Sequence, residues 1–270
     1  MTVKPVSDRM IAETSSKGNQ EKWTEGGRWY KLDQFGYEAL AEVLTSELLE
    51  RSNIESGTPF RFTRYRMERI AAHGRERTGC SSENFLGAGE SIVTLSRLYR
   101  LQGSPLPELL AKLPSGRKRL AFLAERTAEL TGLADFPRYL TLLLEIDALV
   151  LNDDRHLNNI AVIDRGGSFG YCPIFDQGAG LLSNILYAPM DIIPASLIRQ
   201  ARARPLNMTF GRQLGTARGL YGSVLRMPKL TAHELSAMIE PLLEYYPARD
   251  RALIADRACQ VVLTRQKYIM

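Results

Sequence analysis

Apolar residues recur at helical spacing through much of the chain beyond residue 67. Residues 136–151 are apolar nearly all round the predicted helix, which is typical of a buried, central element. The same spacing predicts helices over residues 90–100 and 118–130, and Gly132 follows the second of these as a typical helix stop. We therefore expect this larger part of the chain to be mostly α-helical.

The earlier part of the chain carries strand patterns. Residues 28–32 form an alternating run after a turn that contains two glycines, and residues 58–67 form a second run rich in aromatic residues. Between them, residues 36–51 place leucines on one face of a helix. We predict an α+β, bilobal fold, with a small β-rich lobe holding one helix over residues 1–67 and a larger, mostly helical lobe over residues 68–270.

A polar loop and a hairpin follow the central helix. Two short strands are predicted over residues 160–163 and 169–175, joined by a turn rich in glycine. Asn159 stands at the entrance of the first strand and Asp176 at the exit of the second. Because paired strands lie about 5 Å apart, an antiparallel hairpin should bring these two residues together.

The polar residues around this hairpin are those that phosphoryl transfer needs. One carboxylate must orient the attacking hydroxyl, for which Asp154 is placed on the loop before the hairpin. Asn159 and Asp176 offer oxygen ligands that suit Mg²⁺. Arg155 and His156 are expected to fix the loop, and either could steady phosphate charge. Two further residues are interpreted as turn or capping groups, Asn152 and Asp153.

A cation for the nucleotide phosphates is expected from the small lobe. Lys31 lies on the strand predicted over residues 28–32, and Glu38 begins the helix that follows. A Lys–Glu ion pair of this kind holds the ammonium group at the phosphates in kinases. Glu42, one turn further along the helix, is the second candidate for the partner. The polar loop of residues 15–22 could cradle phosphate through its backbone amides.

Composition favours a cytoplasmic protein. The chain of 270 residues has three cysteines, an odd number that is typical of a reducing compartment. No apolar run is long enough to span a bilayer, and we see no secretory signal. We therefore expect no membrane partner.

The formal net charge is +5, and arginines gather in two stretches, residues 61–77 and 199–204. A basic surface attracts nucleotides, nucleic acids or acidic proteins. We interpret both stretches as mixed, solvated surface. Nucleic-acid binding stays the weaker alternative, because no helix-turn-helix, zinc-finger or RNA-binding signature is visible.

The catalytic segment resembles that of the HipA-like serine/threonine kinases, a family related in fold to protein kinases and phosphoinositide kinases. The family pattern Asn-x-Asp-Arg-His-x-x-Asn, with an aromatic-Asp pair downstream, is matched here by Asn152, Asp154, Arg155, His156, Asn159, Phe175 and Asp176. The family's phosphate loop, Ser-x-Gly-x-Gln-x-Lys, is matched by Ser16, Gly18, Gln20 and Lys22. The resemblance implies a protein-kinase-like fold and the use of ATP and Mg²⁺.

The resemblance also implies a role for each matched residue. Asp154 would be the catalytic base, and Asn159 and Asp176 would be the Mg²⁺ ligands. Lys31 would bind the ATP phosphates, supported by a glutamate for which Glu38 is the best match.

Several family members phosphorylate a serine of their own phosphate loop, which makes Ser15 and Ser16 candidates here. Full-length HipA toxins also carry an additional N-terminal subdomain that packs on a DNA-binding antitoxin. Because Lys31 lies so near the start of the sequence, we expect a compact form without that subdomain and do not expect such an antitoxin partner.

The sequence thus predicts a Mg·ATP-dependent serine/threonine protein kinase of the HipA-like type, whose partners are ATP and a protein with a Ser or Thr acceptor. Two alternatives stay open. A kinase for a small hydroxylated molecule or a lipid headgroup would use the same Asp154, Asn159 and Asp176. A non-catalytic, nucleotide-binding regulator would bind ATP without transferring phosphate.

Overall fold

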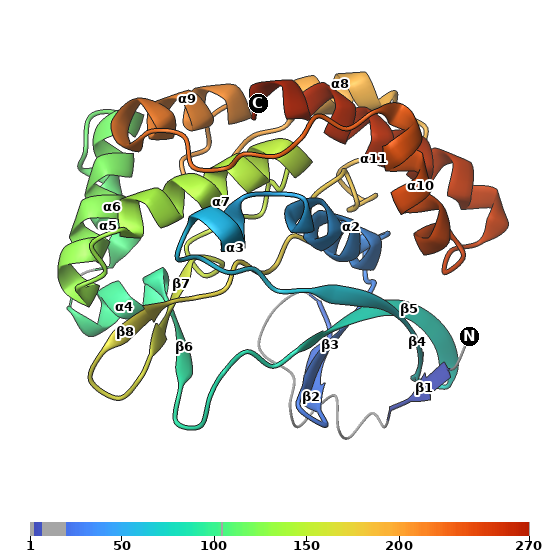
Figure 1. The fold of residues 1–270 in the computed structure, drawn as a ribbon, viewed down its shortest axis with the longest axis horizontal. Helices are drawn as coiled ribbons and strands as arrows, with labels where there is room; N and C mark the ends of the chain where they lie inside the picture. Colours follow the sequence, from blue (N-terminus) through green and yellow to red (C-terminus); the bar gives the residue numbers. More distant parts are fainter. Residues whose placement is uncertain (1–2, 7–19, 104, 270) are drawn as a thin grey trace.

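The computed structural model describes residues 3–6, 20–103 and 105–269. A five-stranded sheet and a three-stranded sheet lie on one side of the molecule, and most of the helices lie on the other (Figure 1). The α+β class predicted from the sequence is confirmed. Within the described ranges, no helix combines the length and the apolar character needed to cross a bilayer.

The larger sheet has the strand order β1-β4-β5-β3-β2. Its strands are β1 Val3–Pro5, β2 Lys22–Glu25, β3 Arg28–Leu32, β4 Tyr65–Ala72 and β5 Arg75–Glu83. β1 runs parallel to β4, and all other neighbours are antiparallel. The strand predicted over residues 28–32 is confirmed as β3.

Helix α2, Glu38–Glu50, packs on one face of this sheet. It contacts β3, β4 and β5, and also helix α10. Because it is covered from both sides, nearly all of its residues are buried, including Leu40, Leu44 and Leu48. Each of these leucines contributes about 1.5–3 kcal/mol through burial. The short helix α3, Ile54–Gly57, follows.

The predicted boundary between residues 67 and 68 lies inside strand β4, so a division of the chain there would cut a strand. The sheet continues to Glu83, and the expectation that the chain turns helical directly after residue 67 is wrong. β5 escapes a pattern search because its sequence is mostly polar. Ser81 on this strand is nevertheless buried. Its hydroxyl donates a hydrogen bond to Glu68 and accepts one from Arg28. We propose a lobe boundary after Glu83.

The smaller sheet joins β6 Ser91–Thr94, β7 Ala161–Asp164 and β8 Phe169–Tyr171 in that order. The hairpin predicted after the polar loop is confirmed, since β7 and β8 pair antiparallel, but β8 ends at Tyr171 and not at residue 175 as predicted. The helix predicted over residues 90–100 is correct only in its second half, α4 Leu95–Leu101. Its first half pairs with β7 as strand β6, a tertiary contact that overrides the helical spacing.

The remaining helices form the other part of the molecule. They are α5 Leu106–Ala111, α6 Gly116–Thr131, α7 Phe136–Val150, α8 Pro194–Gln200, α9 Phe210–Tyr221, α10 Ala232–Leu243 and α11 Ala248–Arg265, followed by a 3₁₀ turn at Gln266–Tyr268. Helix α7 lies at the centre, in contact with α6, α9 and α11 (Figure 1). The predicted central helix is therefore confirmed, as is the stop at Gly132, whose φ of 71° is the left-handed conformation that glycine adopts without strain.

Candidate active site

The loop after α7 is fixed by a buried carboxylate on the helix itself. Asp147 accepts from the guanidinium of Arg155, with Nε 3.0 Å from Oδ2, and from Asn152 Nδ2 at 3.0 Å. Leu151 ends the helix in a left-handed conformation, with φ 56°, and turns the chain back toward Asp147. Residues 152–159 are therefore held against α7.

Arg155 joins the two ends of the hairpin. Its Nη1 donates to the carbonyl oxygens of Asn159 at 2.8 Å and Phe175 at 3.1 Å. The two residues predicted to converge, Asn159 and Asp176, thus belong to backbone segments bound to one nitrogen atom. The side chain of Arg155 is fully buried, and Asp147 takes up its other nitrogens. The expectation that Arg155 could steady phosphate charge is therefore corrected. Its guanidinium is buried and bound to Asp147 and to two backbone carbonyls, so its role is to fix the loop.

Asn152 is a second link between the loop and the segment after the hairpin. The interpretation of Asn152 as a turn or capping residue did not include this role. Its Nδ2 donates to Gln177 Oε1 at 3.0 Å and to the carbonyl of Asp176 at 3.3 Å, and its Oδ1 accepts from the amide of Asp154 at 3.2 Å. One buried side chain thus ties the loop of Asp154 to the segment of Asp176. The sequence did contain a signal for this role. Asn152 follows an apolar helix and is therefore expected to be buried, and a buried side-chain amide needs hydrogen-bond partners.

Asp154 lies on the exposed side of this loop. Burial of part of the carboxylate raises its pKa, the charge of His156 lowers it, and the charge of Asp176 raises it again. His156 Nε2 lies 3.7 Å from Asp154 Oδ2, and its Nδ1 lies 3.2 Å from the amide nitrogen of Asn158. His156 is thereby oriented toward Asp154. Asp153, on the same loop, is also exposed.

Lys31 lies between two carboxylates. Its Nζ is 2.5 Å from Glu42 Oε1 and 2.7 Å from Asp176 Oδ1. Burial favours the neutral amine, but the charges of Asp176 and Glu42 outweigh this effect and hold the pKa of Lys31 well above its ordinary value. Burial would raise the pKa of Asp176, yet Lys31 and Lys22 lower it far below its ordinary value. Lys31 is therefore charged, and Asp176 is ionised.

The partner of Lys31 is Glu42, so the preference for Glu38 is wrong. Glu38 is the first residue of α2, and its carboxylate accepts from the amides of Phe35 at 2.7 Å and Gly36 at 3.1 Å. The Glu38 carboxylate thus accepts hydrogen bonds from backbone amides just before the helix, and a negative charge at a helix N-terminus stabilises the helix. Glu42 is one turn further along and faces the site, where Oε2 also accepts from the amide of Gln177 at 2.8 Å.

The end of the predicted phosphate loop lies beside Lys31. Lys22 on β2 is directly opposite Lys31 on β3, so the two side chains share a face of the sheet. Burial lowers the pKa of Lys22, Asp176 raises it, and Lys31 lowers it. Gln20 Nε2 donates to the carbonyl of Leu32 at 2.9 Å and holds the loop end to β3. Three residues lie outside the described residues: Ser15, Ser16 and Gly18.

Two oxygen atoms at this site are of the kind that divalent cations bind and have no described hydrogen-bond partner. Asn159 Nδ2 donates to the carbonyl of Asp154 at 3.0 Å, and its Oδ1 accepts no hydrogen bond from a described residue. Lys31 donates to Oδ1 of Asp176, whereas Oδ2 of Asp176 has no hydrogen-bond partner among the described residues. Asp176 and Asp154 also repel each other, as the pKa of Asp154 records. A hard cation with oxygen ligands would offset this repulsion.

No model of a known protein family matches this sequence, and a search of curated proteins finds no similar one. Among solved structures, the Helicobacter pylori proinflammatory kinase CtkA is similar, with a TM-score of 0.59 and 10% sequence identity over 95% of this chain and 94% of that chain. The chain has a kinase-like fold. The fold expected from the resemblance to HipA-like kinases is thereby confirmed.

A second similar chain comes from the structure of the Shewanella oneidensis MR-1 toxin–antitoxin system HipA, HipB and its operator DNA complex. Its TM-score is 0.45 and its sequence identity 16%, over 93% of this chain and 61% of that chain. At such identities a likeness extends to the fold alone, so the chemistry of the site is argued from the residues of this chain.

Proposed function

We propose that this chain is a HipA-like kinase that transfers the γ-phosphate of Mg·ATP to a Ser or Thr hydroxyl of a protein. The observation that carries the proposal is the position of Lys31, held 2.5 Å from Glu42 and 2.7 Å from Asp176. The same Asp176 segment is bound to the loop of Asp154 through Asn152. The groups that the proposal assigns to the phosphates, to the metal and to the acceptor hydroxyl thus lie on segments that contact one another, which supports phosphoryl transfer.

In this proposal the acceptor hydroxyl donates a hydrogen bond to Asp154. The bond from the acceptor oxygen to the γ-phosphorus forms while the bond from that phosphorus to the β-phosphate oxygen breaks, leaving ADP. The hydroxyl proton passes to the carboxylate of Asp154, whose raised pKa makes it a better base than an ordinary aspartate. His156 orients that carboxylate, and the ammonium groups of Lys31 and Lys22 bind the phosphates.

Asn159 and Asp176 are the residues that would hold Mg²⁺. When bound, the ion neutralises charge on the β- and γ-phosphate oxygens. Arg155 acts through the backbone of both segments and is a positioning residue. Autophosphorylation is part of the proposal, with Ser15 and Ser16 as the acceptor candidates.

Two variants at neighbouring positions test the proposal, Asp154→Asn and Asp153→Asn. Both remove one negative charge from the same exposed loop, so a general electrostatic effect would be equal in the two. With γ-labelled ATP, Mg²⁺ and a generic protein substrate, we expect Asp154→Asn to lower the rate of label transfer by about 10²–10⁴-fold. Asp153→Asn should keep the rate of the unaltered chain.

Nucleotide binding, measured by calorimetry, should stay within about threefold in both variants, since neither carboxylate is assigned to ATP. Full activity of Asp154→Asn would overturn the assignment of the base. ATP loss without labelled protein would favour a small-molecule or lipid acceptor. Nucleotide binding with neither label transfer nor ATP loss would favour a non-catalytic regulator.

A further inference from the structure

Arginines of the two basic stretches differ in how their charge is balanced. In the first stretch, Arg64 pairs with Glu50 and Glu55, and Arg69 and Arg77 pair with other glutamates. In the helical part, Arg199 of the second stretch forms no ion pair with a described residue, and neither do two cations outside both stretches, Arg265 and Lys267. Charge left unpaired on several adjacent side chains points to an anion.

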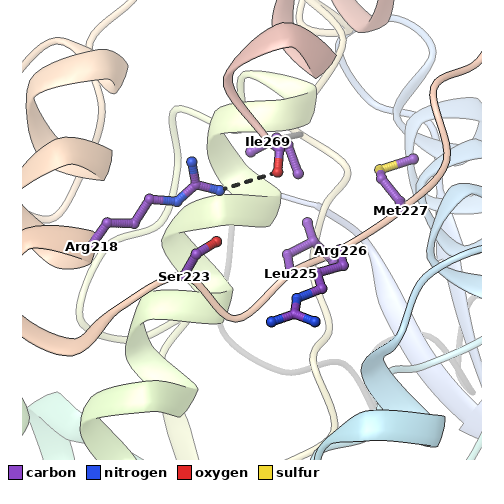
Figure 2. A pocket seen from close by; sticks show the side chains of 6 residues that line it. All are labelled: Arg218, Ser223, Leu225, Arg226, Met227 and Ile269. Atoms are coloured by element: carbon purple, nitrogen blue, oxygen red, sulfur yellow. Dashed lines mark hydrogen bonds between the residues drawn. The ribbon is translucent and has the colours of Figure 1, made fainter.

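Two cavities of the helical part are lined by arginines, and they differ in whether a buried donor is left without a described partner. The larger, of about 440 Å³, is lined by Arg218, Ser223 and Leu225 among others (Figure 2). Two arginines line it, Arg218 and the exposed Arg226. Arg218 Nε lies 2.6 Å from the buried carboxylate of Glu145, and its two remaining nitrogens donate to the carbonyls of Tyr268 and Ile269. No buried polar side-chain atom that lines this cavity lacks a hydrogen-bond partner among the described residues.

The second cavity, of about 300 Å³, lies where α8, the start of α9 and the end of α11 meet. Its wall includes Thr209, Phe210 and Gly211, the cap and first residues of the twelve-residue helix α9. Thr209 Oγ1 caps the amide of Arg212, whereas the amides of Phe210 and Gly211 have no described acceptor. Open amide donors and the positive end of the helix dipole both attract an anion at this place.

A buried guanidinium lines the same cavity. Arg265 is only 7% exposed, yet its Nη2 has no hydrogen-bond partner among the described residues. Its Nε donates to the carbonyl of Ala148 at 2.8 Å, and its Cζ lies 4.5 Å from the ring centre of Tyr268. Burial lowers the pKa of this guanidinium, and the effect of Tyr268, which raises it, does not offset this. Native proteins rarely leave such a donor unsatisfied without a ligand or water.

The exposed side of the cavity adds Arg199 and Lys267, and no acidic side chain occurs among the described residues that line it. A Cβ added at Gly211 would meet nothing within 4 Å, so the backbone there faces open space. Planar guanidinium groups and helix amides are the donors that proteins use for phosphate oxygens. The volume suits a phosphate with a small organic substituent.

We propose that this cavity is a phosphate-binding site, separate from the candidate active site, in which Arg265, the start of α9 and Lys267 hold a phosphate or phosphomonoester dianion. Arg265 would supply Nη2, the α9 amides would bind further oxygens, and Lys267 would close the outer side. The site does not depend on the proposed kinase activity, because its donors belong to other elements than those that carry Lys31 and Asp154.

The test is a titration of the ¹⁵N-labelled full chain with inorganic phosphate and, separately, with O-phospho-L-serine, at constant ionic strength set by NaCl. The amide signals of Phe210 and Gly211 report on the cavity itself, so phosphate bound at the active site would not imitate the result. We expect saturable shifts of both signals with each probe, and a lower dissociation constant for phosphoserine. Saturation by inorganic phosphate alone would assign the site to the free ion. The absence of saturable shifts with both probes would overturn the proposal.

A pair of exposed residues provides matched variants, Lys267→Ala and Arg212→Ala. Each removes one positive charge near the start of α9, but only Lys267 lines the cavity. We expect Lys267→Ala to weaken binding by about tenfold, and Arg212→Ala to change it by less than about twofold. Equal effects of the two would reduce the site to general charge attraction and overturn the proposal.

Two further variants probe the inner donors. Arg265→Gln should abolish saturation, but it alters a buried residue that also binds Ala148, so its fold needs checking by circular dichroism. Gly211→Asp avoids this difficulty, because the position is exposed and a carboxylate in the first turn of a helix favours folding. It should weaken phosphate binding by at least about tenfold while the melting temperature is kept or raised. Unchanged phosphate binding in Gly211→Asp would contradict the proposed place of the anion.

Discussion

Lys31 and Asp176 form an ion pair, Nζ to Oδ1 2.7 Å, although 145 residues separate them in the sequence. The contact joins strand β3 of the larger sheet to the segment that leaves the hairpin of the helical part. Glu42 supports it from α2, binding Lys31 through Oε1 and the amide of Gln177 through Oε2. Three distant stretches of the chain therefore determine the position of one ammonium group.

Replacing Glu42 should impair ATP use, whereas replacing Glu38 should not. Glu42→Gln removes a charge-assisted hydrogen bond to Lys31, worth about 1.5–3 kcal/mol, so we expect kcat/KM for ATP to fall about 10–100-fold. Glu38→Gln weakens only the bonds to the amides of Phe35 and Gly36 and should lower the melting temperature with little change in KM. Steady-state kinetics with varied ATP distinguish the two. An equal rise in KM for both variants would contradict the assignment of Glu42.

Loss of Arg155 should destabilise the fold. Arg155→Met leaves Asp147 as a buried, unpaired carboxylate, which costs about 3–5 kcal/mol and corresponds to a fall in melting temperature of about 10 °C for a chain of this size. The double variant Asp147→Leu, Arg155→Met removes both charges and should recover part of that loss. Thermal denaturation followed by circular dichroism measures both. If the double variant were as unstable as the sum of the two single variants, the ion pair would not be the cause.

Asp153 should make stability depend on pH. Although Asp153 is exposed, partial loss of water around its carboxylate and the neighbouring charge of Asp154 raise its pKa from 3.8 to about 6 in the folded chain. The folded state thus holds this proton more tightly than the unfolded state, and the contribution is present at about pH 4 and lost as the pH rises through about 6. Asp153→Asn should therefore raise the melting temperature at about pH 8 and make little difference at about pH 4. A gain that is the same at both pH values would exclude this cause.

Removal of the Asn159 side chain should change the magnesium requirement. We expect Asn159→Ala to raise the Mg²⁺ concentration for half-maximal label transfer by about tenfold or more, because a ligand oxygen is lost. Asn158, its exposed neighbour, is the matched control, since its backbone amide makes the contact with His156 and its side chain is not assigned to the metal. Asn158→Ala should keep the requirement of the unaltered chain. A shift of the same size in Asn158→Ala would show that loop mobility, rather than lost ligation, is being measured.

The sequence pattern predicted those helices and strands in which buried positions carry apolar residues and exposed positions carry polar ones. Helix α7 is apolar nearly all round and buried along most of its length, and β3 follows a turn that contains two glycines. Strand β5 could not be found in this way, since Ser81 is buried through hydrogen bonds to residues of two other strands. The strand β6 was missed for a related reason, because its pairing with β7 is a long-range contact that helical spacing does not contain.

The sequence alone determined which groups are available and in what order: an Asp and an Asn on one loop, an Asp after one hairpin, and a Lys on an early strand. It could do so because a turn, a hairpin and a strand are local structures whose residues are neighbours in the chain. Only the tertiary structure decided that Glu42 rather than Glu38 meets Lys31, and that Arg155 lies in the core. Both results depend on which side of α2 and which side of the loop are covered by other elements. Packing between segments that are distant in the sequence determines this, and a local pattern does not contain it.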